Sequence, residues 1–253
     1  MAILRVILRT HGGLGNQLFQ IAFGRLMART YGAELVEIHE MRYPTRPTRS
    51  TDVAVSVGVP SAAERLTSYL RLPKLTYKAK LSRKEYVHLG GTFFCDGYFQ
   101  SKSQYDRFAK HDVAQVLREL RESVGIAAQP PLSYLIHLRL GDFFKLRSDA
   151  QNHARERLTK VPLGADVITN EEAVFAEPDI AQLVAEKQLR IVSTENFSGE
   201  DVLRFMAQYQ TIDANDSTLV FWASVLSGSA VAFRSPALQE CRDYFRACLE
   251  SAK

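Results

Sequence analysis

AILRVILRTHGGLGNQLFQIAFGRLMARTYGAELVEI, residues 2–38, is the stretch that decides the fold. Its first part, residues 2–9, is short and rich in aliphatic side chains, which is typical of a buried strand. A helix is predicted from about Asn16 to Tyr31, because apolar residues recur at four-residue spacing: Leu18, Ala22 and Leu26. Gly32 stands where a helix-terminating glycine belongs, and residues 33–38 read as the next strand. This order predicts a parallel α/β sheet.

A second α/β pattern follows a linker. Strand 92–95 and a helix over about 103–124 complete the first half, and AAQPP at 127–131 has linker composition. Beyond it the pattern predicts strands and helices in alternation: strand 133–138, an irregular charged loop at 143–170, strand 190–193, helix 199–209, a short strand near 212, helix 218–226, strand 230–233 and a helix to about 249. The sequence therefore predicts two lobes, 1–126 and 132–253.

Composition limits the classes of protein that need to be considered. Hydrophobic residues make up 46% and charged residues 24% of the 253 residues, as in globular proteins. The net charge of +4 is too small to indicate a nucleic-acid partner. Three cysteines without CxxC spacing favour reduced thiols in a cytoplasm over a disulfide framework or a zinc site.

The sequence also bears on membrane contact. The apolar run at 3–8 contains Arg5 and does not resemble a signal peptide, and no apolar stretch approaches the roughly 18 residues that cross a bilayer. A basic segment over 71–84 has two interpretations. It is either a solvated face or a surface for an anionic membrane or a lipid-diphosphate acceptor. We therefore expect a cytoplasmic protein, with peripheral contact at the inner face of the membrane under the second interpretation.

The first motif that carries chemistry is HGGLGNQLFQ at 11–20. Gly13 and Gly15 let the backbone turn sharply and let a ligand approach, while a helix beginning at Asn16 offers free N–H groups to an anion. The spacing differs from GxGxxG, so the dinucleotide fingerprint is not met. The alternative is a tight strand–helix turn capped by Asn16.

The second motif is HLRLGDF at 137–143. A buried strand that includes His137 delivers Arg139 to its carboxyl end, where ligands of open parallel sheets bind. The planar guanidinium of an arginine suits a diphosphate because it donates paired hydrogen bonds and stays charged. The alternative is an ion pair between Arg139 and Asp142 that fixes the turn.

The third motif is IDANDSTLVFWASVL at 212–226. Asn215, Ser217 and Thr218 open an apolar helix, and hydroxyls with free N–H groups at a helix start form a phosphate cradle. The alternative is an ordinary helix cap. Trp222 is expected in the core.

Together these motifs resemble the bacterial alpha-1,2-fucosyltransferases (glycosyltransferase family 11-like), which are related to the protein O-fucosyltransferases. GGLGNQLFQ is similar to the N-terminal signature of that family. HLRLGD is similar to its His-x-Arg-Arg-Gly-Asp pattern, with Leu140 in place of the second arginine. Residues 215–223 resemble an Asn-Ser-Ser/Thr-Phe-Ser-Trp-Trp-Ala segment. Weaker resemblances lie at 95–105 and 191–203, where Ser198 and Asp201 also form a capping-box pattern.

The resemblance implies a GT-B-like α/β fold, in which two Rossmann-like lobes face a cleft. The N-terminal lobe with its GGLGNQ turn would take the acceptor, and the C-terminal lobe would bind the nucleotide-sugar donor. The implied activity is an inverting, metal-independent transfer of fucose from GDP-fucose to a glycan hydroxyl, as in a galactoside 2-alpha-L-fucosyltransferase. No cofactor or metal is expected besides the donor. The alternatives are a transferase for another nucleotide sugar, or a catalytically silent relative that binds nucleotide sugar or glycan.

The resemblance also implies roles for single residues. Arg139 would be the main electrostatic catalyst, with His137, Asn215, Ser217 and Thr218 lining the donor site. Asn16 would hold the phosphate end or the sugar from the other lobe, beside Gly13 and Gly15. Asp142 would orient Arg139 or act as general base, a role for which the sequence also offers His11, Asp96 and Glu195.

Overall fold

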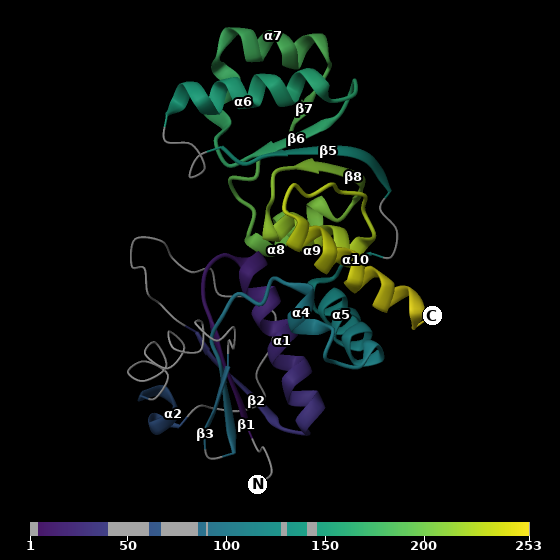
Figure 1. Cartoon of the computed structure of the whole chain (residues 1–253). Coiled ribbons are helices and arrows are strands. Elements are labelled where there is room, and N and C mark those ends of the chain that lie inside the picture. Colours follow the sequence, from purple (N-terminus) through teal and green to yellow (C-terminus); the bar gives the residue numbers. More distant parts are fainter. Residues whose placement is uncertain are drawn as a thin grey trace. The chain divides into compact units, whose positions relative to one another are not determined.

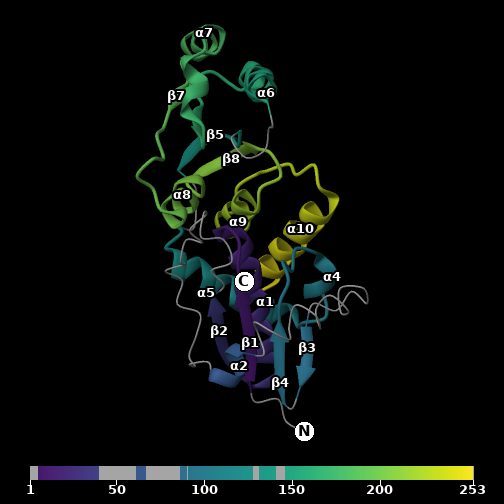
Figure 2. The same cartoon turned by 90° about the vertical axis from the view of Figure 1, so that its left-hand side faces the viewer.

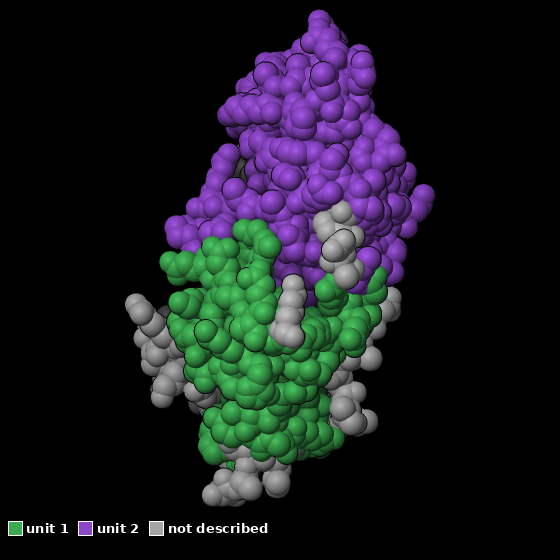
Figure 3. Space-filling model, turned by 90° about the vertical axis from the view of Figure 1, so that its right-hand side faces the viewer, with its two compact units in different colours: residues 1–125, 240–253 green, residues 126–239 purple. Residues whose placement is uncertain are grey.

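The computed structural model describes residues 5–39, 61–66, 86–89, 91–127, 131–140 and 146–252. By its contacts the chain divides into two compact units, coloured separately in Figure 3. Unit 1 comprises residues 1–125 and 240–253, and unit 2 comprises residues 126–239. The predicted lobes were 1–126 and 132–253, so the structure differs in grouping residues 240–253 with the first lobe.

Unit 1 is built on a four-stranded sheet with the order β2-β1-β4-β3. β1 (Arg5–Thr10) pairs in parallel with β2 (Glu34–His39) and with β4 (Thr92–Cys95), whereas β3 (Tyr86–Leu89) is antiparallel to β4. The short α2 (Ala62–Leu66) precedes β3 in the chain. The predicted strand–helix–strand beginning is confirmed.

α1 (Leu14–Tyr31) packs on this sheet, as Figures 1 and 2 show. Gly24 permits the close approach, because a Cβ atom there would lie 3.0 Å from Leu8 and 3.2 Å from Leu35. The helix ends at Gly32, which adopts the predicted left-handed conformation with a φ of 60°. Its start was predicted wrongly: the N-cap is Gly13, and Asn16 lies in the first turn.

The predicted helix over 103–124 is two helices, α4 (Lys102–Tyr105) and α5 (Lys110–Val124). α10 (Pro236–Ser251) contributes its later residues to the same unit. The ring of Phe245 lies 4.6 Å from that of Tyr105, edge to face, and Arg118 donates to the carbonyl of Ala252 at 2.6 Å. These contacts explain why residues 240–253 group with unit 1.

Unit 2 is built on an all-parallel sheet with the order β7-β6-β5-β8. The strands are β5 (Leu132–Leu138), β6 (Asp166–Thr169), β7 (Arg190–Ile191) and β8 (Tyr209–Ala214). α6 (Arg147–Lys160) and α7 (Pro178–Glu186) lie on one face, with the 3₁₀ helix η3 (Glu172–Ala176) between β6 and α7. α8 (Gly199–Met206) and α9 (Thr218–Ser227) lie on the other (Figure 1).

The prediction of an irregular loop over 143–170 was wrong, because α6 and β6 lie within it. α6 buries only two apolar side chains fully, Ala154 and Leu158, so its sequence carries no apolar stripe that would reveal a helix. The predicted strand 230–233 is reduced to one bridge between Ala230 and Thr211. The predicted fold class, α/β with parallel sheets, is confirmed.

Candidate functional site

The carboxyl ends of three parallel strands meet at one edge of the unit 2 sheet. His137 on β5 is in register with Ile168 on β6 and with Ala214 on β8. Arg139 follows β5 directly and Asn215 follows β8 directly, so both predicted donor-site residues leave the sheet at this edge. In parallel sheets this edge is where ligands bind.

The start of α9 adds backbone donors at the same place. Ser217 is the N-cap, with extended backbone, and Thr218 is the first helical residue. Within the described residues, the Ser217 hydroxyl makes no capping hydrogen bond, although the residue is 4% exposed. The Ser217 side chain is therefore not used as a helix cap, and α9 begins on the carboxyl side of the sheet with its first N–H groups.

His137 is a neutral imidazole at this edge. Burial, followed by the positive charges of Arg139 and Arg157, lowers the pKa of His137 to about 4. Its Nδ1 is buried and has no hydrogen-bond partner among the residues that the structure describes. A buried polar atom of this kind is a place where a polar ligand gains a hydrogen bond.

Arg157 on α6 is part of the site and was missed by sequence reasoning. It is 7% exposed, and its guanidinium donates to Asn215 Oδ1 and to Asp213 Oδ1, each at 2.5 Å. Asn215 Nδ2 in turn lies 3.1 Å from His153 Nε2. Both polar atoms of the Asn215 side chain are thus engaged within the protein. The charged stretch around Arg157 offered no signal, because most arginines in such stretches face solvent.

The second residue after β5 is a buried core residue. Leu140 is fully buried in the cluster that α6 and α7 cover, and its N–H donates to Asn170 Oδ1 at 2.8 Å. The side chain that replaces the second arginine of the family pattern therefore faces the core. Gly141 and Asp142 lie outside the described residues, so the predicted role of Asp142 stays a prediction.

The glycine turn of unit 1 lies at the carboxyl edge of its own sheet, beside the segment that follows β4. Gly12 has a φ of +82°, a conformation that favours glycine, and Gly13 and Gly15 flank the first residue of α1. Asn16 Oδ1 accepts a hydrogen bond of 2.9 Å from Gln100 Nε2. Two segments that resemble the family, 11–20 and 95–105, are thereby brought together.

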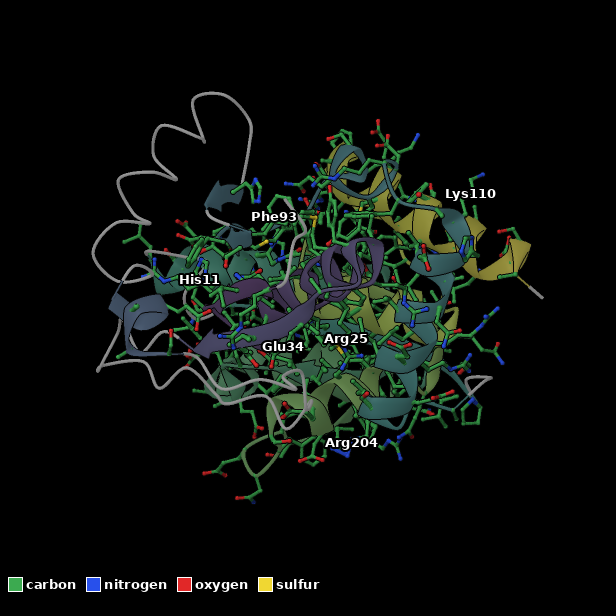
Figure 4. The ribbon with its side chains drawn as sticks, turned by 90° about the horizontal axis from the view of Figure 1, so that it is seen from below. His11, Arg25, Glu34, Phe93, Lys110 and Arg204 are labelled. Carbon is green, nitrogen blue, oxygen red and sulfur yellow. The ribbon has the colours of Figure 1, made fainter. Side chains whose placement is uncertain are left out.

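His11 is held by a buried glutamine. Gln20 Oε1 accepts the backbone N–H of His11 at 3.0 Å, and Gln20 Nε2 lies 3.1 Å from His11 Nδ1. A backbone N–H only donates, so the amide nitrogen must be the group that faces the ring, and Nδ1 accepts from it. The neutral ring therefore carries its proton on Nε2. His11, labelled in Figure 4, also contacts the half-exposed ring of Tyr98 at 5.0 Å.

The other candidate bases are placed less favourably. Asp96 accepts a hydrogen bond from Arg9 at 3.2 Å, and this ion pair is buried. Glu195 is exposed in the turn after β7. Asp216, next to the cap of α9, accepts the backbone N–H of Arg234 at 2.8 Å. Asp96 and Asp216 thus have structural partners, and Glu195 follows the edge strand β7, which β6 separates from β5.

Unit 1 also has a groove, of about 920 Å³, at the opposite end of its sheet from the glycine turn. The end of α1, the start of β2 and α5 line it, and Arg25 and Glu34 from its lining are labelled in Figure 4. Two of its lining residues, Arg29 and Glu119, form an ion pair of 2.8 Å. None of the predicted site residues that the structure describes lines this groove.

Three properties of the described residues bear on metals, membranes and thiols. No group of three or more His, Cys, Asp or Glu side chains in the described ranges could hold a metal ion. No helix in the part of the chain that the structure describes is long and apolar enough to span a membrane. Cys95, Cys241 and Cys248 are buried free thiols. The basic segment 71–84 lies outside the described residues.

Comparison with known proteins gives matches in structure alone. No protein-family model matches the chain, and no curated protein matches it. A variant of Arabidopsis thaliana FUT1 in complex with GDP is similar, with 12% identity, 91% of this chain and 70% of that chain covered, and a TM-score of 0.51.

Two further solved structures are similar over most of this chain. One is the NodZ alpha-1,6-fucosyltransferase of Bradyrhizobium co-crystallized with GDP, with 15% identity, 90% of this chain and 93% of that chain covered, and a TM-score of 0.47. The other is POFUT1 in complex with GDP, with 10% identity, 92% and 98% covered, and a TM-score of 0.46. The similarity to plant FUT1 confirms the α/β fold class.

Proposed function

We propose that this chain is a fucosyltransferase that moves fucose from GDP-fucose to a hydroxyl of a glycan acceptor. The observation that carries the proposal is the edge of the unit 2 sheet, where Arg139, the start of α9 and the neutral His137 converge. A permanent cation and free backbone N–H groups are the donors that a diphosphate takes. The shared fold with a plant FUT1 variant that binds GDP supports the guanosine nucleotide.

The chemistry follows from where charge develops. When the bond between fucose and phosphate breaks, negative charge grows on the β-phosphate of GDP. Arg139, with Ser217 and Thr218, would stabilise that charge through donors that are already in place. Gly13, Gly15 and Asn16 would contact the donor phosphate or sugar from unit 1, and Asn215 would contribute to the donor site by shaping the turn before α9.

Inversion at the anomeric carbon requires a base for the acceptor hydroxyl. The tautomer of His11 makes its Nε2 a donor, which makes His11 a poor base in this state. We assign the role to Asp142. Arg139 and the α9 start supply the positive field that a metal would otherwise provide, so the proposed reaction is metal-independent.

The resemblance extends the proposal to the acceptor and the compartment. It favours a galactoside as acceptor and a 2-alpha linkage. The three free thiols favour the cytoplasm. A lipid-linked acceptor at the inner face of the membrane would give the basic segment 71–84 a role.

Release of GDP from a panel of donors tests the proposal. GDP-fucose, GDP-mannose and UDP-sugars are each incubated with the protein and with lactose as a galactoside acceptor, and free nucleotide is measured over many turnovers. We expect turnover with GDP-fucose and little with the others. Turnover with a UDP-sugar would show that the enzyme uses a different donor and would contradict the assignment of GDP-fucose. Binding of GDP-fucose without any turnover would favour the silent relative.

A further inference from the structure

Arg157 is a buried residue that holds the turn beside the proposed donor site. It lies on α6 and reaches the turn after β8 across 58 residues of sequence. Arg157 is 7% exposed, and its guanidinium donates to two acceptors, Asn215 Oδ1 and Asp213 Oδ1. A buried charge is tolerated only where such partners hold it, so these contacts fix the geometry of the turn.

The arginine also fixes which way the Asn215 amide faces. A guanidinium has donors only, so Arg157 must meet the oxygen of Asn215. The amide nitrogen then faces His153 Nε2 at 3.1 Å and donates to it. His153 can accept there only when Nε2 carries no proton. The neutral ring must therefore be protonated on Nδ1.

The surroundings of His153 favour that neutral form. Burial, and then the charge of Arg157, lower the pKa of His153. The charged or titratable groups that act on it are Arg157 and Glu156 on α6 and Arg234 from the segment before α10, and the turn after β8 presents Asn215 to it. Among the charged groups only Glu156 favours the protonated ring. The hydrogen bond with Asn215 also raises the pKa of His153, but burial and the two arginines outweigh both.

Asn215 stands two residues before the N-cap of α9. The hydrogen bond from Arg157 on α6 to the Asn215 side chain therefore helps to fix the position of Ser217 and of the first N–H groups of α9. We propose that Arg157 is a positioning residue that holds Asn215 and so sets the start of α9 for binding a nucleotide diphosphate, and that the arrangement requires His153 to be neutral. This inference rests on the proposed function and identifies how its anion site is kept in place.

Two variants of Arg157 and one matched control test the positioning role. Arg157→Gln removes the charge, and Arg157→Lys keeps it on one nitrogen that does not reproduce the planar fork between the two acceptors. Arg155→Lys, on the same helix but half-exposed and paired with Asp179, is the control. We expect the Kd for GDP-fucose to rise about 10- to 100-fold in both Arg157 variants, as for other residues that orient a ligand-contacting group, and not in the control.

Unchanged affinity in folded Arg157→Gln or Arg157→Lys would overturn the positioning role. Circular dichroism and the midpoint of thermal unfolding show which variants are folded. If Arg157→Gln does not fold, Arg157→Lys decides. If the wild-type protein itself does not bind GDP-fucose, the proposed function fails, and the NMR measurement below still decides whether the arrangement exists.

Nitrogen NMR of the wild-type protein with labelled histidine reads the tautomer of His153 without any ligand. We expect the Nδ1–H form at pH 7.5, and its loss in Arg157→Gln or Arg157→Lys, where the amide is free to turn. An Nε2–H form in the wild-type protein would overturn the inference.

A pH series on GDP-fucose affinity, from pH 5 to pH 7.5, supplies a second functional readout. GDP-fucose has no phosphate group that titrates near neutral pH, so any change comes from the protein. We expect affinity to fall toward pH 5 in the wild type and to fall less in His153→Gln, whose carbonyl oxygen still accepts from Asn215. An equal dependence in both proteins would contradict the requirement for neutral His153.

Discussion

Gln100 Nε2 donates to Asn16 Oδ1 at 2.9 Å, across 84 residues of sequence. The contact joins the segment after β4 to the first turn of α1. We expect Gln100→Leu to lower the turnover of GDP-fucose by about tenfold, because the amide of Asn16 loses the donor that orients it. Steady-state GDP release measures this. Gln115→Leu, on the exposed face of α5, is the control. Equal turnover in both variants would contradict a role for Asn16 in the site.

Arg139→Ala should lower kcat by roughly 10²- to 10³-fold, the effect of removing one preorganised donor to a developing charge. Arg139→Lys should restore little, because a point charge cannot reproduce the planar fork. Arg204→Ala, a half-exposed arginine on α8, should keep wild-type kcat. An Arg139→Ala variant with near wild-type turnover would make Arg139 a structural residue.

Two glycines at the start of α1 and within it, Gly13 and Gly24, should respond differently to substitution by alanine. At Gly24 a Cβ atom would lie 3.0 Å from Leu8, so Gly24→Ala should lower the free energy of unfolding by about 1–3 kcal/mol through overpacking. At Gly13 the Cβ atom would meet nothing within 4 Å, and φ is −73°, so Gly13→Ala should leave stability nearly unchanged. Urea denaturation compares the two. Equal stability of both variants would contradict the close packing of α1 on β1.

His137 should make folding sensitive to mild acid. Its pKa is lowered to about 4 in the folded state, against about 6.5 in the unfolded chain. Between these values the unfolded chain binds one proton more than the folded one, so stability falls as pH falls from about 6.5 toward 4, by on the order of 1 kcal/mol per pH unit. Urea denaturation at pH 7, 6 and 5 measures the slope. His137→Phe should flatten it, and an unaltered slope would show that other groups cause the acid sensitivity.

Activity should survive exhaustive treatment with EDTA. Hard cations need several oxygen ligands, and the nearest pair to the anion site, Asp213 and Asp216, is engaged by Arg157 and by the Arg234 backbone. GDP release is assayed with chelator, without it, and after magnesium or manganese is added back. Loss on chelation with recovery on addition would make these aspartates ligands.

Sequence could predict those features of the structure whose causes lie within a few residues of the feature itself. The strand, turn and helix of residues 5–31 follow from aliphatic runs and a cluster of glycines, and Gly32 ends the helix as expected. The Ser198–Asp201 capping box was also readable, because its two hydrogen bonds form within one turn.

Features caused by distant contacts could not be predicted in this way. α6 is a helix because Ala154 and Leu158 pack under α7, which no periodicity within the helix reveals. Arg157 and Asn215 are 58 residues apart in the sequence, so the sequence around one of them does not predict the other as its hydrogen-bond partner. The Gly13 cap was misplaced by three residues because glycine and asparagine both suit such a position.

The grouping of residues 240–252 with unit 1 has a consequence for the order of folding during synthesis. Domains generally fold as units when the whole of each has been made. Unit 2 is one uninterrupted stretch, 126–239, whereas the core of unit 1 includes Phe245 and Cys248 beside residues from its first 125. Residues 1–125 therefore stay incompletely buried while unit 2 is synthesised and folds. The core of unit 1 can therefore close only after residues 240–252 have been made, which is later than the whole of unit 2.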